Sequence, residues 1–80
     1  MNTSKTELNQ LLDHLLAANS RADMSARLEQ LLTPTEFDEV VKRLQILCML
    51  DQGIPQRKIA ETLGVGIATV SRGARARKES

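Results

Sequence analysis

Residues 54–72 read IPQRKIAETLGVGIATVSR and contain the clearest structural pattern of the chain. Pro55 is suited to open a short helix, from which Ile59 and Leu63 would point inward. Gly64 supplies the left-handed conformation of a tight turn, and a second short helix follows it. Two short helices joined by such a turn are typical of a helix-turn-helix, so the pattern predicts one here.

The second helix of this pair begins with small outward side chains, as a helix entering the major groove of DNA requires. Val65 and Val70 would fill the angle between the helices and leave Ile67, Ala68 and Thr69 outside. Alanine and threonine can contact thymine methyl groups, and a hydroxyl can bond to either partner of a base pair. We therefore predict that double-stranded DNA is contacted by Gln56, Arg57, Lys58, Ile67, Ala68, Thr69, Ser71, Arg72 and Arg75. The same turn also joins helices in proteins that never touch nucleic acid, which leaves a purely structural role open.

Charge is divided unevenly along a chain whose net charge is only +1. Residues 1–52 hold five Lys/Arg against eight Asp/Glu, a balance of −3, whereas residues 53–80 hold six against two, a balance of +4. This asymmetry indicates that the carboxyl-terminal part faces a polyanion, the alternative being a solvated surface. The chain contains a single aromatic residue, a phenylalanine, so it lacks the stacking platforms that hold single-stranded nucleic acid.

Apolar spacing in the amino-terminal part predicts an amphipathic helix over residues 4–19. Ser4 and Glu7 fit a capping box, and Asn19 is suited to a left-handed stop. One face of this helix is expected to form core or a seam with a partner helix, and it carries Leu8, Leu11, Leu12, Leu15 and Leu16.

Two further helices are expected before residue 54. The second is short, covers residues 21–32 and is capped by Ser20. The third starts at a second capping box, Thr33-Pro34-Thr35-Glu36, and ends at Gly53. Its second half is apolar almost all round, which predicts burial at the centre of the fold or across a subunit boundary. Cys48, the only cysteine, is interpreted as a reduced core thiol of a cytosolic protein.

Eighty residues, 41% of them hydrophobic, predict one small all-α domain. Its parts are amino-terminal dimerisation helices (1–32), a long core helix (33–53) and a DNA-reading head (54–80), called the reading head below. A chain this small buries too little surface alone, so we expect a homodimer. His14 is the only histidine, and no Cys/His cluster has the spacing of a metal site, so neither a metal nor a required cofactor is expected.

Membrane and enzyme functions are disfavoured. No apolar run reaches the length of a membrane span and the first residues do not form a signal peptide, so we expect a cytoplasmic protein. No strained nucleophile turn and no glycine-rich phosphate loop occurs, so catalysis is not expected.

Residues 31–78 resemble the tryptophan repressor family of bacterial transcription regulators. The resemblance rests on Leu32-Thr33-Pro34, Arg43, residues 56–59 (QRKI) and above all residues 64–73 (GVGIATVSRG). It implies an intertwined all-helical homodimer that represses transcription at a pseudo-palindromic operator in the nucleoid. It also implies that L-tryptophan is a corepressor whose indole lies between two arginines. By position, the ligand would be lined by Leu32, Thr33, Arg43, Thr69, Arg72 and Gly73.

The sequence departs from that family at several points. Ala76 stands where the family has a serine near the ligand's amino group, and Gln30 replaces an apolar pocket residue. The turn 53–55 is one residue shorter, which is similar to shorter relatives of the true repressors, and we expect the family's final helix to be absent. A different small molecule, a regulator that binds DNA without ligand, and a helical dimer that binds an acidic protein are the alternatives. Arg43 could instead pair with Glu39 on its own helix, and Arg72 could bind phosphate.

Overall fold

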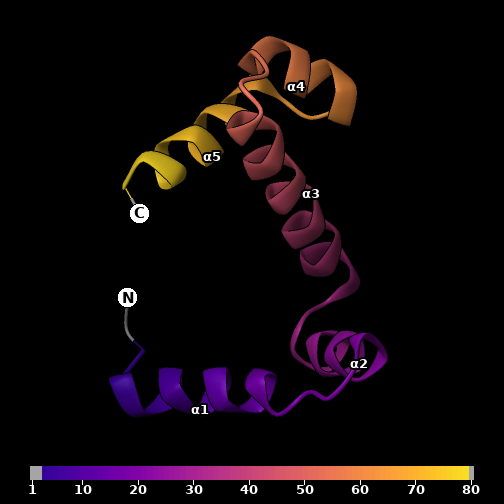
Figure 1. The fold of residues 1–80 in the computed structure, drawn as a ribbon, viewed down its shortest axis with the longest axis vertical. Coiled ribbons are helices and arrows are strands. Elements are labelled where there is room, and N and C mark those ends of the chain that lie inside the picture. The colour runs from indigo at the N-terminus through magenta and orange to yellow at the C-terminus, as the bar shows by residue number, and fades with distance from the viewer. Residues whose placement is uncertain (1–2, 80) are drawn as a thin grey trace. The chain divides into compact units, whose positions relative to one another are not determined.

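The computed structural model describes residues 3–79, with side chains through residue 77. In this range it contains the helices α1 (Lys5–Leu16), α2 (Arg21–Leu31), α3 (Pro34–Asp51), α4 (Gln56–Leu63) and α5 (Ile67–Glu79), as Figure 1 shows. The described residues include no strand, so the predicted all-α class is confirmed. The chain divides after Phe37 into two compact units.

The amino-terminal ends of α1 and α3 carry the same reciprocal cap. Ser4 Oγ accepts from the Glu7 backbone N–H at 3.1 Å, and Glu7 Oε1 accepts from the Ser4 N–H at 3.2 Å. The corresponding distances between Thr33 and Glu36 are 3.2 and 2.8 Å. Each cap satisfies backbone donors that the first turn of a helix leaves without a partner. Both predicted capping boxes are therefore confirmed.

These caps make stability depend on pH through two glutamates. Hydrogen bonding with the side chain and then the backbone of Ser4 holds the pKa of Glu7 below its ordinary value of 4.5. The backbone and then the side chain of Thr33 do the same for the pKa of Glu36. A pKa that is lower in the folded state means that the unfolded state binds more protons, so the contribution is complete above pH 4.5 and is lost as pH falls below it.

Below pH 4.5, we expect the free energy of unfolding of the Glu7→Gln/Glu36→Gln double variant to depend less on pH than that of the natural chain. Glutamine keeps the capping geometry but does not titrate, so the variant isolates the charge. Denaturant unfolding measured between neutral and acid pH checks this. The prediction would be wrong if the free energy of unfolding changed with pH by the same amount in the two proteins.

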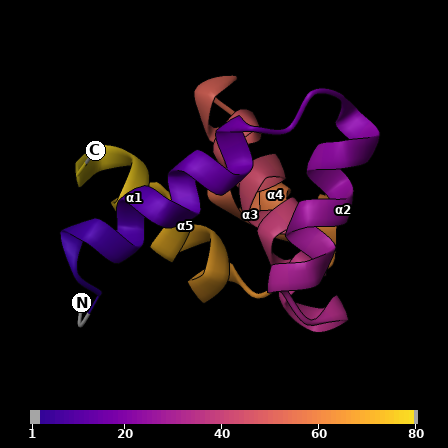
Figure 2. The same cartoon turned by 90° about the horizontal axis from the view of Figure 1, so that it is seen from below.

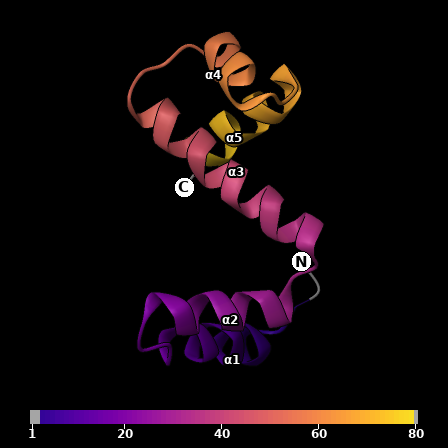
Figure 3. The ribbon, with the colours of Figure 1, turned by 90° about the vertical axis from the view of Figure 1, so that its right-hand side faces the viewer.

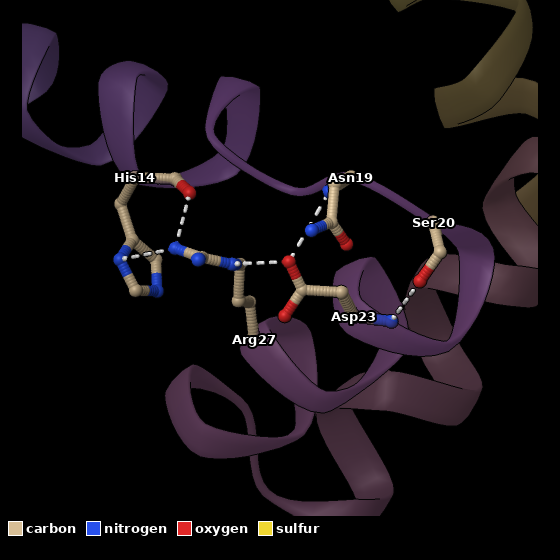
Figure 4. A network of polar contacts seen from close by, with 5 residues as sticks. All are labelled: His14, Asn19, Ser20, Asp23 and Arg27. Carbon is tan, nitrogen blue, oxygen red and sulfur yellow. Dashed lines mark hydrogen bonds and ion pairs between the residues drawn. The ribbon is translucent and has the colours of Figure 1, made fainter.

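Helices α1 and α2 of the first unit run in roughly opposite directions (Figure 2), and the side chain of Arg27 joins them (Figure 4). Arg27 Nη1 donates to the His14 carbonyl oxygen at 2.9 Å and lies 3.3 Å from His14 Nδ1, while its Nε lies 3.2 Å from Asp23 Oδ2. Asp23 also accepts from the Asn19 N–H at 3.2 Å, and Ser20 Oγ caps α2 by accepting from the Asp23 N–H at 3.0 Å. The last carbonyl groups of a helix lack partners within it, and Arg27 satisfies one that α1 leaves open.

The predicted left-handed stop at Asn19 is wrong. Helix α1 ends at Leu16, Ala17 keeps a right-handed conformation with φ −74°, and no described residue other than glycine has a positive φ. Arg27 donates to the His14 carbonyl oxygen at the end of α1, and Asp23 accepts from the Asn19 N–H. These backbone groups therefore have partners without a left-handed residue at Asn19. No residue of α1 or α2 is buried in the single chain, and the leucine face of α1 lies open.

The second unit has a small core where three helices meet. Ile46 of α3, Ile59 of α4 and Val70 of α5 each expose 1% or less of their surface. Around them pack partly buried apolar residues, namely Met49, Leu50, Ile54, Ala60, Leu63 and Val65. Figure 3 shows α4 and α5 beside the carboxyl-terminal half of α3. Gly64 turns from α4 towards α5 with φ +67°, which confirms the predicted helix-turn-helix.

The predicted burial of α3 does not hold within one chain. Ile46 is its only buried residue among those described, Leu44 is 61% exposed, and Cys48 is exposed rather than a core thiol. The reading head covers only one face of α3, and an apolar sequence does not say which face that is. Helix α3 ends at Asp51, close to the predicted stop at Gly53, and Gly53 adopts the predicted left-handed conformation with φ +78°.

Helix α5 is held against α3 at two points. Gly73 allows the close approach, since a Cβ built on it would lie 2.8 Å from Ile46 Cγ2. Further along, Arg77 of α5 pairs with Asp51 at the end of α3. These contacts fix α5 relative to the long helix and so set the shape of the space between them.

Candidate nucleic-acid interface and ligand cavity

The start of α5 is presented to solvent. Ile67 is 50% exposed, Ala68 is exposed, and Thr69 is half-buried. Burial of Val70 turns Ala68 outward, because a residue two positions earlier lies on the opposite side of the helix. Ile67 is the first residue of α5, where no preceding turn of the helix covers it. The side chains that the sequence predicts as base contacts therefore do form a small, accessible surface at one helix end.

Gln56 and Ser71 join the two helices of the reading head. Ser71 Oγ donates to Gln56 Oε1 at 2.8 Å, across 15 residues of sequence. The sequence suggests each as a DNA contact but gives no sign of their pairing, because hydrogen bonds between distant residues leave no periodic pattern.

The predicted basic contacts are exposed and available. Arg57, Lys58, Arg72 and Arg75 all lie at the surface, and within residues 3–77 none of them has an ion-pair partner. The first turn of α4 holds no acidic residue. Exposed cations on both helices of the reading head are suited to contact phosphate groups.

A cavity of about 660 Å³ lies between α3 and α5 in the second unit. It is lined by Glu39, Lys42, Arg43, Ile46, Leu47, Val65, Thr69, Arg72, Gly73 and Ala76. The structure thus brings together four of the residues predicted to line a ligand, Arg43, Thr69, Arg72 and Gly73. Leu32 and Thr33 are not among the lining residues and belong to the first unit.

The cavity carries charges of both signs. Lys42, Arg43 and Arg72 face it, together with one carboxylate, Glu39. In the described part of the chain, Glu39 and Arg43 form no ion pair with each other, so the pairing considered from sequence is not seen. Lys42 and Glu39 are lining residues for which the sequence indicates no ligand role, although the spacing of residues 39, 42, 43 and 46 places them on one face of a helix.

Two residues that depart from the tryptophan repressor pattern occupy different places. Ala76 lines the cavity and offers it no hydrogen-bonding side chain, whereas Gln30 is exposed on α2. Among the described residues, no three His, Cys, Asp or Glu side chains are grouped so that they could hold a metal ion. None of the described helices is both long and apolar enough to cross a membrane.

Comparisons with known proteins point to one family. The family model described as "Trp repressor protein" matches residues 6–80. Curated proteins named "Trp operon repressor homolog" are similar to the chain, with 44% identity over 69 residues in Photobacterium profundum and 41% over 71 residues in Vibrio cholerae. These alignments cover 85% and 88% of this chain, and 67% and 69% of the relatives. The chain thus spans about two thirds of the relatives' length. No solved structure matches it significantly.

Proposed function

Because this chain belongs to the Trp repressor family, we propose that it is a transcription repressor that binds double-stranded DNA in a sequence-specific way. The observation that carries this proposal is the exposed start of α5, in a reading head whose Arg57, Lys58, Arg72 and Arg75 have no ion-pair partner among the described residues. A helix entering the major groove reads bases with its first side chains, while flanking cations neutralise phosphates. The protein would act in the bacterial cytoplasm, at the nucleoid.

Different residues should carry affinity and sequence preference. Ile67 and Ala68 are exposed at the start of α5 and are suited to contact base edges. Arg57 and Lys58, in the first turn of α4, are suited to contact phosphates. Phosphate contacts add affinity for every duplex, whereas base contacts distinguish one duplex from another.

We expect Arg57→Ala to weaken binding to all duplexes alike and to lower the slope of log affinity against log salt by about one. We expect Ala68→Gln to change the preferred DNA sequence, with a change in binding free energy of about 1–3 kcal/mol at each affected base pair. The slope of log affinity against log salt should stay unchanged. Selection from random duplex DNA, followed by titration at several salt concentrations, checks both. Equal, sequence-independent losses in the two variants would contradict the division of roles. Wild-type protein that binds no duplex even at low salt would favour the protein-interaction alternative.

The proposed repressor is a homodimer whose amino-terminal helices form the dimer contact. The support is the open leucine face of α1, where Leu8, Leu11 and Leu12 are each 40% to 45% exposed and Leu16 is 79% exposed. A dimer with two equivalent heads favours a pseudo-palindromic operator, because protein and DNA symmetry then match.

The cavity is the proposed site of a small-molecule corepressor, with L-tryptophan as the first candidate. Guanidinium groups of Arg43 and Arg72 can stack on an indole and pair with a carboxylate. Glu39 can take the ammonium group, which the side chain of Ala76 cannot bind. Thr69 lines the cavity and also lies in the first turn of α5, so a ligand there would bear on the reading helix.

We expect added L-tryptophan to change its fluorescence emission and anisotropy when it binds, a signal free of interference because the chain has no Trp and no Tyr. Arg43→Ala should abolish the change, whereas Arg21→Ala, a control on α2 outside the cavity, should not. Linkage requires that specific DNA tighten ligand binding by the same factor by which the ligand tightens DNA binding. Unaltered emission at millimolar L-tryptophan with strong specific DNA binding would leave a ligand-independent regulator or another ligand.

A further inference from the structure

The hydrogen bond between Ser71 and Gln56 has a chemical consequence for the reading head. Gln56 is the first residue of α4, and Ser71 lies in the second turn of α5. A glutamine carboxamide offers one acceptor group, its oxygen, and two N–H donors. Because Ser71 Oγ donates to Gln56 Oε1 at 2.8 Å, the oxygen faces α5 and the Nε2 donors are left for another partner.

We propose that Ser71 is a positioning residue that orients the Gln56 carboxamide so that Nε2 donates to a DNA phosphate; this inference rests on the proposed DNA-binding function. A free glutamine side chain samples many rotamers and can present either its oxygen or its nitrogen. In the structure the Ser71 hydroxyl engages the oxygen, which leaves the Nε2 donors for a partner, and phosphate oxygens are acceptors only. Preorganising a side chain lowers the entropic cost of binding.

A phosphate is favoured over a base edge as the partner of Gln56. Arg57 and Lys58 follow Gln56 in the first turn of α4, and they are exposed and without ion-pair partners among the described residues. The side chains suited to base edges lie instead at the start of α5. The Gln56 contact should therefore add affinity for all sequences, and because glutamine is neutral it should leave the salt dependence unchanged.

The test is a double-variant cycle measured as affinity for one specific and one random duplex. We expect Gln56→Ala to weaken binding to both about tenfold and Ser71→Ala about fivefold, as expected for losing a hydrogen bond to a charged group or its orientation. In the Gln56→Ala background, Ser71→Ala should cost less than about twofold, because the residue it positions is gone. Ser71→Thr keeps a hydroxyl and should restore most of the affinity.

Thr62→Ala is the matched control for removing a hydroxyl from this motif. Thr62 Oγ1 donates to the Lys58 carbonyl oxygen at 2.8 Å, and the residue lies near the far end of α4. This variant should leave DNA affinity unchanged. In the free protein, the NMR signals of the Gln56 side-chain NH₂ should shift in Ser71→Ala and stay in place in Thr62→Ala.

Two outcomes would overturn the inference while the proposed function stands. The first is additive losses in the cycle, which would mean that Ser71 contacts DNA independently. The second is a change of sequence preference or of salt slope in Gln56→Ala. If the natural chain binds no duplex, the proposed function fails and the phosphate role of Gln56 fails with it, whatever the NMR signals show.

Discussion

Leu12→Asp is expected to convert a dimer into monomers, with a dimer dissociation constant raised by at least about 100-fold. In the single chain Leu12 is 45% exposed on a face shared with Leu8, Leu11 and Leu16, so a carboxylate there costs little in a lone chain. In the proposed dimer the same face is covered, and the charge would be buried without a partner. Sedimentation measured over a range of protein concentrations checks this.

Gln10→Asp is the matched control, because it introduces the same charge on the exposed opposite side of α1. It should leave the dimer intact. A natural chain that sediments as a folded monomer at micromolar concentration would contradict the proposed assembly. Equal dissociation of both variants would show that charge on α1, and not its leucine face, controls association.

Ile59→Ala is expected to lower the free energy of unfolding by about 2–5 kcal/mol, a range typical of large-to-small changes in a core. Ile59 is fully buried, and only Ile46 and Val70 share that degree of burial among the described residues. With so few buried side chains nearby, the core cannot rearrange to fill the cavity that the substitution leaves. DNA binding should weaken for every sequence, because α5 loses its support. Denaturant unfolding and duplex titration measure the two effects.

Ile67→Ala provides the contrast for the same chemical change at a half-exposed position. Ile67 is 50% exposed at the start of α5, so its loss should change stability by less than about 1 kcal/mol. Its effect should instead be on DNA sequence preference. Equal losses of stability in the two isoleucine variants would contradict the assignment of one to the core and the other to the binding surface.

The local features of this fold could be predicted from the sequence because they depend on neighbours within one turn of helix. The capping boxes at Ser4 and Thr33 involve residues three apart, and each is found as predicted. The left-handed turns at Gly53 and Gly64 follow from the freedom of glycine at positive φ. The helix-turn-helix and its inward residues follow from this punctuation and from apolar spacing.

What required the tertiary structure was the choice among helix faces and the pairing of distant side chains. The second half of α3 is apolar on several sides, and only the docking of α4 and α5 decides that Ile46 is buried and Cys48 exposed. Arg27 reaches back 13 residues to His14, and Ser71 reaches back 15 residues to Gln56. The cavity likewise combines residues from α3 and α5. Periodicity along one helix fixes which residues share a face, but the partner of that face depends on contacts between elements that are far apart in the chain.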